Sequence, residues 1–226
     1  MSGGAAKIGA VVFDLDDTLY PETDYVKSGF AEVGKVMESR FGISDAYQKL
    51  LDCFLADRND VYGRVLSGSN AVFTQGDIAD LVRLYRTHTP KLTLSEEVRQ
   101  TLSALRKRGL KLGVITDGRP YQQRAKMTAL GIEGLVDCAI VTDELGGEEY
   151  RKPHPKAFET MYARLDVAPN QMIYVGDNPK KDFAIKRYLP VKTVMLQSGL
   201  YRDESFLDGI EPDTIIQSFS ELLKEV

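Results

Sequence analysis

Two aspartates, separated by one residue, directly follow a short apolar run. Asp14 and Asp16 come after Ile8–Phe13, in the stretch Asp-Leu-Asp-Asp-Thr. In an extended chain, residues two apart point the same way, so the two carboxylates would project together. Such neighbours repel each other unless a cation or a proton lies between them. Magnesium is the natural cation, because it binds one or two carboxylates together with substrate phosphate oxygens.

A second apolar run, Lys111–Ile115, ends in Thr116, Asp117 and Gly118. A hydroxyl, followed by backbone N–H groups on a glycine turn that leads into a helix near Pro120, is suited to hold a phosphate. By itself, the stretch could equally be an ordinary turn between a strand and a helix.

A lysine and two more aspartates occur further along the chain. Lys152 precedes Pro153 in a loop stiffened by prolines, and its ammonium is a compact charge suited to a phosphoryl group. Asp177 follows the run Met172–Val175 and could complete a cation site with Asp14 and Asp16. Asp182 stands five residues later, where a helix is expected to start and its dipole would favour an acid.

Each of these stretches has an ordinary explanation on its own, but together they indicate one site. The runs that precede them are short, apolar and rich in β-branched residues, as in strands buried on both faces of a parallel sheet. Five runs of this kind occur: Ile8–Phe13, Lys111–Ile115, Cys138–Val141, Met172–Val175 and Lys192–Leu196. Helical patterns separate the later four, which predicts an α/β fold with a doubly wound, parallel, five-stranded sheet. Ligands bind at the carboxyl ends of such strands.

The first connection is much longer than the others and is predicted to contain a separate helical domain. Residues 21–88 carry three apolar helical stripes, around Val26–Met37, Tyr47–Phe54 and Ile78–Tyr85. A structureless loop of this length would be unusual. We therefore expect an α/β core formed by residues 1–20 and 89–226, with residues 21–88 as a helical insert. The helix expected from Ser95 would lead back into the second strand.

These motifs resemble those of the haloacid dehalogenase-like hydrolase superfamily. Asp14–Thr18 matches its first motif, Thr116 its second, Lys152 in its Lys-Pro context its third, and Gly176–Asp182 its fourth. The resemblance covers roughly residues 7–20 and 89–200. It implies a Rossmann-like core, a helical cap between the first two motifs, and a phosphatase that uses Mg²⁺.

The resemblance also implies a role for each matching residue. Asp14 would be the nucleophile that forms an aspartyl-phosphate, and Asp16 the general acid and base. The Asp14 carboxylate, the Asp16 backbone carbonyl and Asp177 would bind the magnesium, with Asp182 supporting it from outside the coordination shell. The phosphoryl oxygens would bind to a set that consists of Thr116, the backbone around Asp117 and Gly118, and Lys152.

Other polar residues are less informative. On the insert, Lys49, Arg58 and Arg64 are candidates to contact the leaving group, as is Tyr20 in the core, although charges on such helices are usually just solvated. His154 is expected to be structural or exposed, and His88 to lie on the surface. The cysteines, Cys53 and Cys138, lack any metal-binding or redox spacing and are expected to be reduced and largely buried.

The overall charge restricts the partners. The net charge of −4 argues against a dedicated nucleic-acid binder but permits a small anionic substrate in a locally positive pocket. No apolar run is long enough to span a bilayer, and no signal peptide is apparent, so a cytoplasmic location is expected. The expected partner is a small phosphorylated metabolite, and the oligomeric state stays open.

Three alternative functions remain. A 2-haloacid dehalogenase of the same fold would need no metal and would lack Asp16, so Asp16, Asp177 and Asp182 argue against it. A phosphomutase would share the aspartyl-phosphate step and is not separated from a phosphatase by these motifs. A catalytically silent binding protein is disfavoured because both Asp14 and Lys152 are present.

Overall fold

The chain folds into two compact units. A computed structural model describes residues 7–197, 201 and 204–226. Met1–Pro21 and Thr93–Val226 form the first unit, called the core unit here, and Glu22–Leu92 form the second, called the helical unit.

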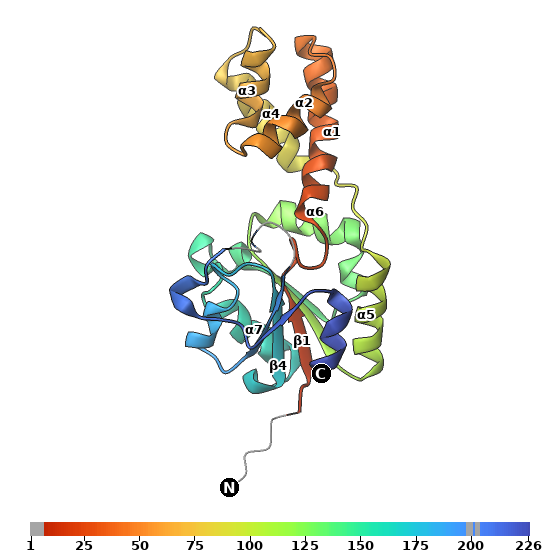
Figure 1. Ribbon diagram of the computed structural model, residues 1–226, viewed down its shortest axis with the longest axis vertical. Coiled ribbons are helices and arrows are strands. Elements are labelled where there is room, and N and C mark those ends of the chain that lie inside the picture. Colours follow the sequence, from red (N-terminus) through yellow and green to blue (C-terminus); the bar gives the residue numbers. More distant parts are fainter. Residues whose placement is uncertain (1–6, 198–200, 202–203) are drawn as a thin grey trace. The chain divides into compact units, whose positions relative to one another are not determined.

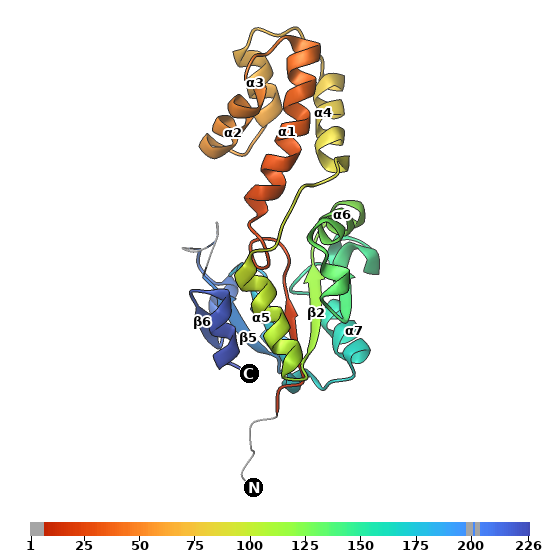
Figure 2. The ribbon, with the colours of Figure 1, turned by 90° about the vertical axis from the view of Figure 1, so that its right-hand side faces the viewer.

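The core unit contains one parallel sheet of six strands, in the order β3-β2-β1-β4-β5-β6. The strands are β1 (Ala10–Phe13), β2 (Lys111–Thr116), β3 (Cys138–Val141), β4 (Met172–Gly176), β5 (Lys192–Leu196) and β6 (Thr214–Ile216). Figure 2 shows β2 toward one edge of the sheet and β5 and β6 toward the other edge. The five expected strands are present, but the expected number is wrong: β6 is a three-residue edge strand whose Ile215 is 48% exposed, so no buried apolar run marks it.

Helices cover both faces of this sheet. They are α5 (Glu96–Lys107), α6 (Pro120–Leu130) and α7 (Lys156–Leu165), and Figure 1 shows α5 and α7 on either side of the strands. Side chains alternate between the faces along β1. Val12 packs in one cluster with Phe158 of α7, whereas the ring of Phe13 lies 5.5 Å from that of Phe219. The sheet is therefore buried on both faces, as its uninterrupted apolar strands predict.

Short 3₁₀ helices make up the remaining regular structure in the described part of the chain. They are η1 (Ile132–Gly134), η2 (Thr142–Leu145), η3 (Glu148–Tyr150), η4 (Pro169–Gln171), η5 (Ala184–Arg187), η7 (Leu207–Gly209) and η8 (Phe219–Lys224).

The position of β1 determines where a site can form. The strand order reverses between β1 and β4, and a crevice forms at the carboxyl edge at such a point. Phe13, the last residue of β1, pairs with Val114 of β2 and with Val175 of β4. The residues that follow these three strands therefore meet at one edge.

The helix before β2 is bounded by the expected signals. Ser95 is the N-cap of α5, and its hydroxyl accepts a hydrogen bond of 3.3 Å from the Val98 N–H. Gly109 follows the end of the helix with φ = 80°, a conformation that favours glycine.

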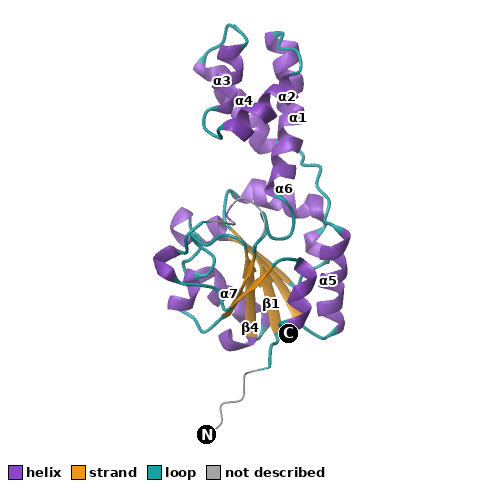
Figure 3. Ribbon diagram, viewed as in Figure 1, coloured by secondary structure: helices purple, strands orange, loops and turns teal. Residues whose placement is uncertain are grey.

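The helical unit consists of α1 (Glu22–Phe41), α2 (Ala46–Ala56), α3 (Val61–Gly68) and α4 (Gln75–Thr87). Figure 3 shows only helices and loops in this part of the chain. The predicted stripe of α1 is buried at Val26, Phe30, Val33 and Met37. Helix α3 is an additional helix, beyond the three that the apolar stripes in the sequence predict. It has only eight residues, too few to show a repeated helical period.

His88 is buried, so the expectation that it lies on the surface is wrong. Its side chain is bonded at both ring nitrogens: Nδ1 is 2.7 Å from the Tyr85 carbonyl oxygen and Nε2 is 3.1 Å from Ser28 Oγ. The ring therefore ties the end of α4 to α1. His154 is exposed, as expected.

Two further expectations concern the chain as a whole. Among the described residues, no helix is both long enough and apolar enough to cross a bilayer. Cys53 and Cys138 are both free thiols and are half-buried.

Candidate active site

The carboxyl edge of the sheet gathers three buried aspartates. Asp14 follows β1, Asp177 follows β4, and Asp182 lies four residues beyond Asn178 in the turn that precedes η5. One carboxylate oxygen of each lies within 4.8 Å of one from each of the other two. Gly176 permits this approach, because a Cβ on that residue would lie 2.5 Å from Asp182 Oδ2.

Lys152 lies against this cluster and carries the compensating charge. Its Nζ is 2.7 Å from Asp14 Oδ1 and 2.9 Å from Asp182 Oδ1, and its side chain is fully buried. It also donates a hydrogen bond of 2.9 Å to the Tyr174 hydroxyl, which in turn donates to Asp182. Burial opposes the charged ammonium, but Asp14 and Asp182 outweigh it and raise the pKa of Lys152 above its ordinary value.

Asp14 is held in its ionised form. Burial alone would favour the protonated acid, but the nearby ammonium groups of Lys152 and Lys181 lower the pKa of Asp14 below 3.8. Lys181 Nζ lies 3.8 Å from Asp14 Oδ2 and 3.5 Å from Asp117 Oδ2. An ionised, buried carboxylate at a strand end has the properties of a nucleophile.

Within the cluster, Asp177 is the acid whose negative charge is not balanced by nearby positive charge. Burial first, and then the carboxylates of Asp14 and Asp182, raise the pKa of Asp177 to about 9. Its Oδ1 accepts a 3.4 Å hydrogen bond from Thr18, whereas its buried Oδ2 has no hydrogen-bond partner among the described residues. An unpaired carboxylate oxygen beside two other acids is a fitting ligand for a divalent cation, so the donor set suits a metal ion.

Asp16 is more exposed than Asp14, and its carboxylate contacts three hydrogen-bond donors. Lys126 Nζ is 2.8 Å from its Oδ1, Gln123 Nε2 donates to its Oδ2 at 2.9 Å, and the Tyr20 hydroxyl also donates to Oδ1. Gln123 and Lys126 are three residues apart on α6 and so share one face of that helix. The side chain of Asp16 is 21% exposed, against 3% for Asp14, so Asp16 is the more accessible acid.

The turn after β2 has the features expected of a phosphate loop. Thr116 Oγ1 accepts a hydrogen bond of 2.5 Å from Gln123, and Gly118 adopts φ = 128°, which favours glycine. The Asp117 carboxylate accepts hydrogen bonds from the Lys152 N–H at 3.1 Å and from the Thr142 hydroxyl at 2.9 Å. Asp117 thus ties the Lys152 loop to β2, while its backbone forms the turn.

The structure therefore brings the sequence-predicted core residues to one edge. Among the other candidates, Tyr20 contacts Asp16 directly, whereas Lys49, Arg58 and Arg64 belong to the helical unit.

Sequence reasoning missed Gln123, Lys126 and Lys181. The first two could have been found, because their spacing places them on one face of a helix that starts beside the predicted phosphate turn. The sequence gives no signal for a role of Lys181 in the site, because a lysine next to Asp182 looks like an ordinary surface residue.

Several known proteins are similar to this chain in sequence or in fold. A family model for haloacid dehalogenase-like hydrolases matches residues 11–195. A glyceraldehyde 3-phosphate phosphatase of Methanocaldococcus jannaschii is 30% identical over 224 residues, which cover 96% of each chain. A phosphatase of the same name from Methanopyrus kandleri is 31% identical over 97% of each chain. Among solved structures, a HAD phosphatase from Thermococcus onnurineus aligns with a TM-score of 0.61 and 26% identity, covering 96% of this chain and 97% of its own. The chain therefore belongs to the haloacid dehalogenase-like hydrolase family, and the relatives from Methanocaldococcus jannaschii and Methanopyrus kandleri, which it matches over nearly their whole length, are named as phosphatases.

Proposed function

We propose that this phosphatase depends on magnesium and hydrolyses a small phosphate monoester through an aspartyl-phosphate on Asp14, with the helical unit serving as its cap. The observation that carries the proposal is the buried group of Asp14, Asp177 and Asp182 around Lys152. It combines an ionised nucleophile with an acid whose buried oxygen lacks a partner among the described residues.

The residues that would hold the magnesium are the Asp14 and Asp177 carboxylates and the Asp16 backbone carbonyl. Asp182 would support them, and it already accepts a hydrogen bond of 2.9 Å from the Asn178 N–H. Bound there, the ion would offset the negative charge of the phosphoryl oxygens and orient them.

The reaction proceeds in two steps at phosphorus. A carboxylate oxygen of Asp14 forms a bond to phosphorus while the bond to the ester oxygen breaks, and Asp16 gives its proton to that oxygen. Asp16 then takes a proton from water, whose oxygen bonds to phosphorus as the bond to Asp14 breaks. Inorganic phosphate leaves, and both acids return to their starting state.

The surrounding donors position these groups and stabilise charge. Lys152 and Lys181 offset negative charge on Asp14 and on the transferring phosphoryl group. The Thr116 hydroxyl and the backbone at Asp117 and Gly118 bind its oxygens. Gln123 and Lys126 hold Asp16 in place for both proton transfers.

The relatives suggest where the search for a substrate begins. Because two of them are named glyceraldehyde 3-phosphate phosphatases, that compound is the first candidate. Other sugar phosphates, phosphoglycolate and nucleoside monophosphates share the phosphate monoester group and complete the panel.

The proposal is tested by phosphate release from this panel, with magnesium and with a chelator, in the native chain and in Asp14→Asn. Removal of the nucleophile is expected to lower kcat by about 10⁴-fold or more. Asp45→Asn is the matched control, since Asp45 is an exposed residue of the helical unit whose left-handed backbone asparagine tolerates. It is expected to keep full activity.

Two results would favour another function, and a third would contradict the role of Asp14. Metal-independent release of halide from a chlorinated acid would indicate a dehalogenase. Transfer of the phosphoryl group between sugar hydroxyls, with little free phosphate, would indicate a phosphomutase. Equal rates in Asp14→Asn and the native chain would remove Asp14 from the chemistry.

A further inference from the structure

The helical unit contains a pocket of about 300 Å³ that is made by its own residues. A pocket of this size can hold a small organic molecule. Its lining includes four aromatic rings and two arginines, contributed by all four helices and the α2–α3 turn: Phe30, Phe54, Tyr62, Tyr85, Arg58 and Arg86.

The aromatic rings surround this space as a connected group. Phe30 is central: its ring centroid lies 5.8 Å from that of Phe54, 6.2 Å from that of Tyr62 and 5.9 Å from that of Tyr85. The first two of these contacts are edge-on. The lining is therefore rich in aromatic rings, which suits a flat aromatic guest, because aromatic rings attract one another in stacked and edge-on arrangements.

The two arginines give the rim a positive charge. Arg58 lies over the Phe54 ring, 5.0 Å from its centroid, and so keeps its guanidinium beside an aromatic face. Among the described residues, neither Arg58 nor Arg86 forms an ion pair with a carboxylate. The pocket also contains Asp60, so two positive charges and one negative charge leave a net charge of +1.

Tyr62 adds a polar group to the inner wall. Its hydroxyl has no hydrogen-bond partner among the described residues, although the side chain is half-buried. Burial, its main influence, raises the pKa of Tyr62, so the phenol stays neutral and can donate a hydrogen bond.

We infer that this pocket binds a planar aromatic anion, with the ring among the four aromatic side chains and the acid group on Arg58 and Arg86. A guanidinium presents a planar fork of donors that matches a carboxylate, sulfonate or phosphate. The inference does not rest on the reaction proposed for the core unit, since the observations behind it concern residues of the helical unit alone.

The test is calorimetric titration of the full chain with naphthalene-2-sulfonate, in the presence of a chelator. This probe has a flat ring and an anionic group but no phosphate ester. Cyclohexanesulfonate lacks the aromatic ring and 2-naphthol lacks the anionic group at neutral pH. Both are expected to bind much more weakly than the probe.

Variants locate the bound probe. Arg58→Gln combined with Arg86→Gln is expected to raise its Kd about tenfold. Phe54→Leu keeps an apolar side chain but removes a ring. It is expected to weaken the binding of naphthalene-2-sulfonate more than it weakens the binding of cyclohexanesulfonate. Arg83→Gln is the matched control on the same helix as Arg86, because Arg83 is exposed and pairs with Asp80, and it is expected to leave Kd unchanged.

Competition with saturating inorganic phosphate tests whether the probe binds in this pocket or in the core site. Phosphate is expected not to displace the probe. The inference is overturned if the probe does not bind, if phosphate displaces it, or if its Kd is the same in the native chain and in both pocket variants. Circular dichroism of each variant confirms that it is folded.

Discussion

At the scale of single residues, Lys152 balances the charge of the core site. Its fully buried ammonium contacts Asp14 and Asp182, and Asp177 lies within the same cluster. Removing one partner of a buried ionic group lowers the free energy of unfolding by more than the intact pair adds to it, because the remaining charges stay buried without compensation. The site is therefore sensitive to loss of this one ammonium.

Lys152→Met keeps the length of the side chain and removes its charge. We expect it to lower the free energy of unfolding by about 3 kcal/mol or more and to abolish activity. Urea denaturation at neutral pH without metal measures the first effect. Lys156→Met, at an exposed position on α7, serves as the control. Equal stability of Lys152→Met and the native chain would show that Lys152 does not hold the acids together.

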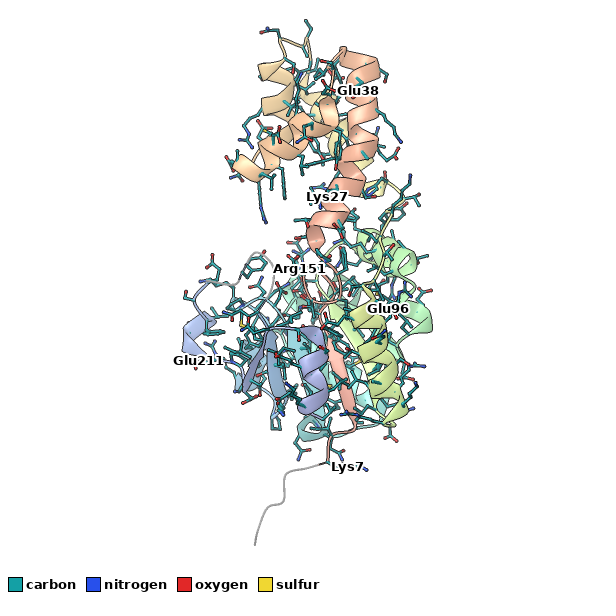
Figure 4. All side chains as sticks on the ribbon, turned by 45° about the vertical axis from the view of Figure 1, so that its right-hand side comes forward. Lys7, Lys27, Glu38, Glu96, Arg151 and Glu211 are labelled. Atoms are coloured by element: carbon teal, nitrogen blue, oxygen red, sulfur yellow. The ribbon has the colours of Figure 1, made fainter. Side chains whose placement is uncertain are left out.

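The residue before Lys152 is fixed by an ion pair. Arg151, labelled in Figure 4, donates two hydrogen bonds of 2.7 Å from Nε and a terminal nitrogen to the two oxygens of Asp143. These hydrogen bonds lower the pKa of Asp143 below 3.8. A lowered pKa in the folded state adds stability above pH 3.8 that is lost as the pH falls through the folded-state pKa.

Asp143→Asn should therefore be less stable than the native chain near pH 6, and this difference should shrink below pH 4. Denaturation at a series of pH values from 2.5 to 6, about the range in which carboxylates titrate, measures the difference. A difference that stays constant across the series would mean that ionisation of Asp143 contributes nothing.

Residue types at strand ends are readable from the sequence, but the partners of each residue are not. Asp14, Thr116 and Asp177 are identifiable because Thr116 ends a buried strand and the two aspartates each follow one, and parallel strands share one carboxyl edge. The donors to Asp16 come from two separate parts of the chain: Tyr20 lies four residues after it, whereas Gln123 and Lys126 lie on α6, so their convergence depends on how α6 packs.

At the scale of elements, each unit contains a helix with a side-chain N-cap. Thr74 and Asp77 form a capping box at the start of α4, with the Asp77 carboxylate 2.7 Å from the Thr74 N–H. Ser95 caps α5 in the core unit. Such caps satisfy backbone N–H groups that have no partner within the helix.

Thr74→Ala and Ser95→Ala are each expected to cost about 1 kcal/mol, but in different parts of the chain. Amide hydrogen exchange should speed up over Gln75–Thr87 in the first variant and over Glu96–Lys107 in the second. Each variant is the control for the other. If both variants changed exchange equally in both units, the two units would not be separate in stability.

Long periodic elements were predictable and short ones were not. The stripe of α1 and the cap and stop of α5 follow from spacing and residue type, which act locally. Strand β6 has three residues and α3 has eight, so neither shows a repeated pattern. The burial of His88 is not predictable from local spacing, because it depends on contacts of its ring with the Tyr85 carbonyl and with Ser28 on another helix.

At the scale of the whole molecule, a cation that binds only the folded chain must stabilise it. Binding adds about 2.7 kcal/mol when the cation is at one hundred times its Kd. The three acids come from segments that meet only in the folded core unit, so an unfolded chain offers no comparable site.

Magnesium is therefore expected to raise the melting temperature of the native chain, and much less that of Asp177→Asn. That variant removes the carboxylate oxygen that lacks a partner among the described residues. Thermal unfolding with and without magnesium, compared with Asp45→Asn, provides the measurement. A rise of the same size in Asp177→Asn would place the cation elsewhere.

The most direct measurement follows the phosphoryl group to its acceptor. In Asp16→Asn, p-nitrophenyl phosphate still reacts because its leaving group needs no proton, whereas water attack slows without the base. The account predicts a burst of p-nitrophenolate and, after acid quench and peptide mass mapping, one phosphoryl group on Asp14. A burst without a phosphoryl group on the chain, or one attached to another residue, would contradict it.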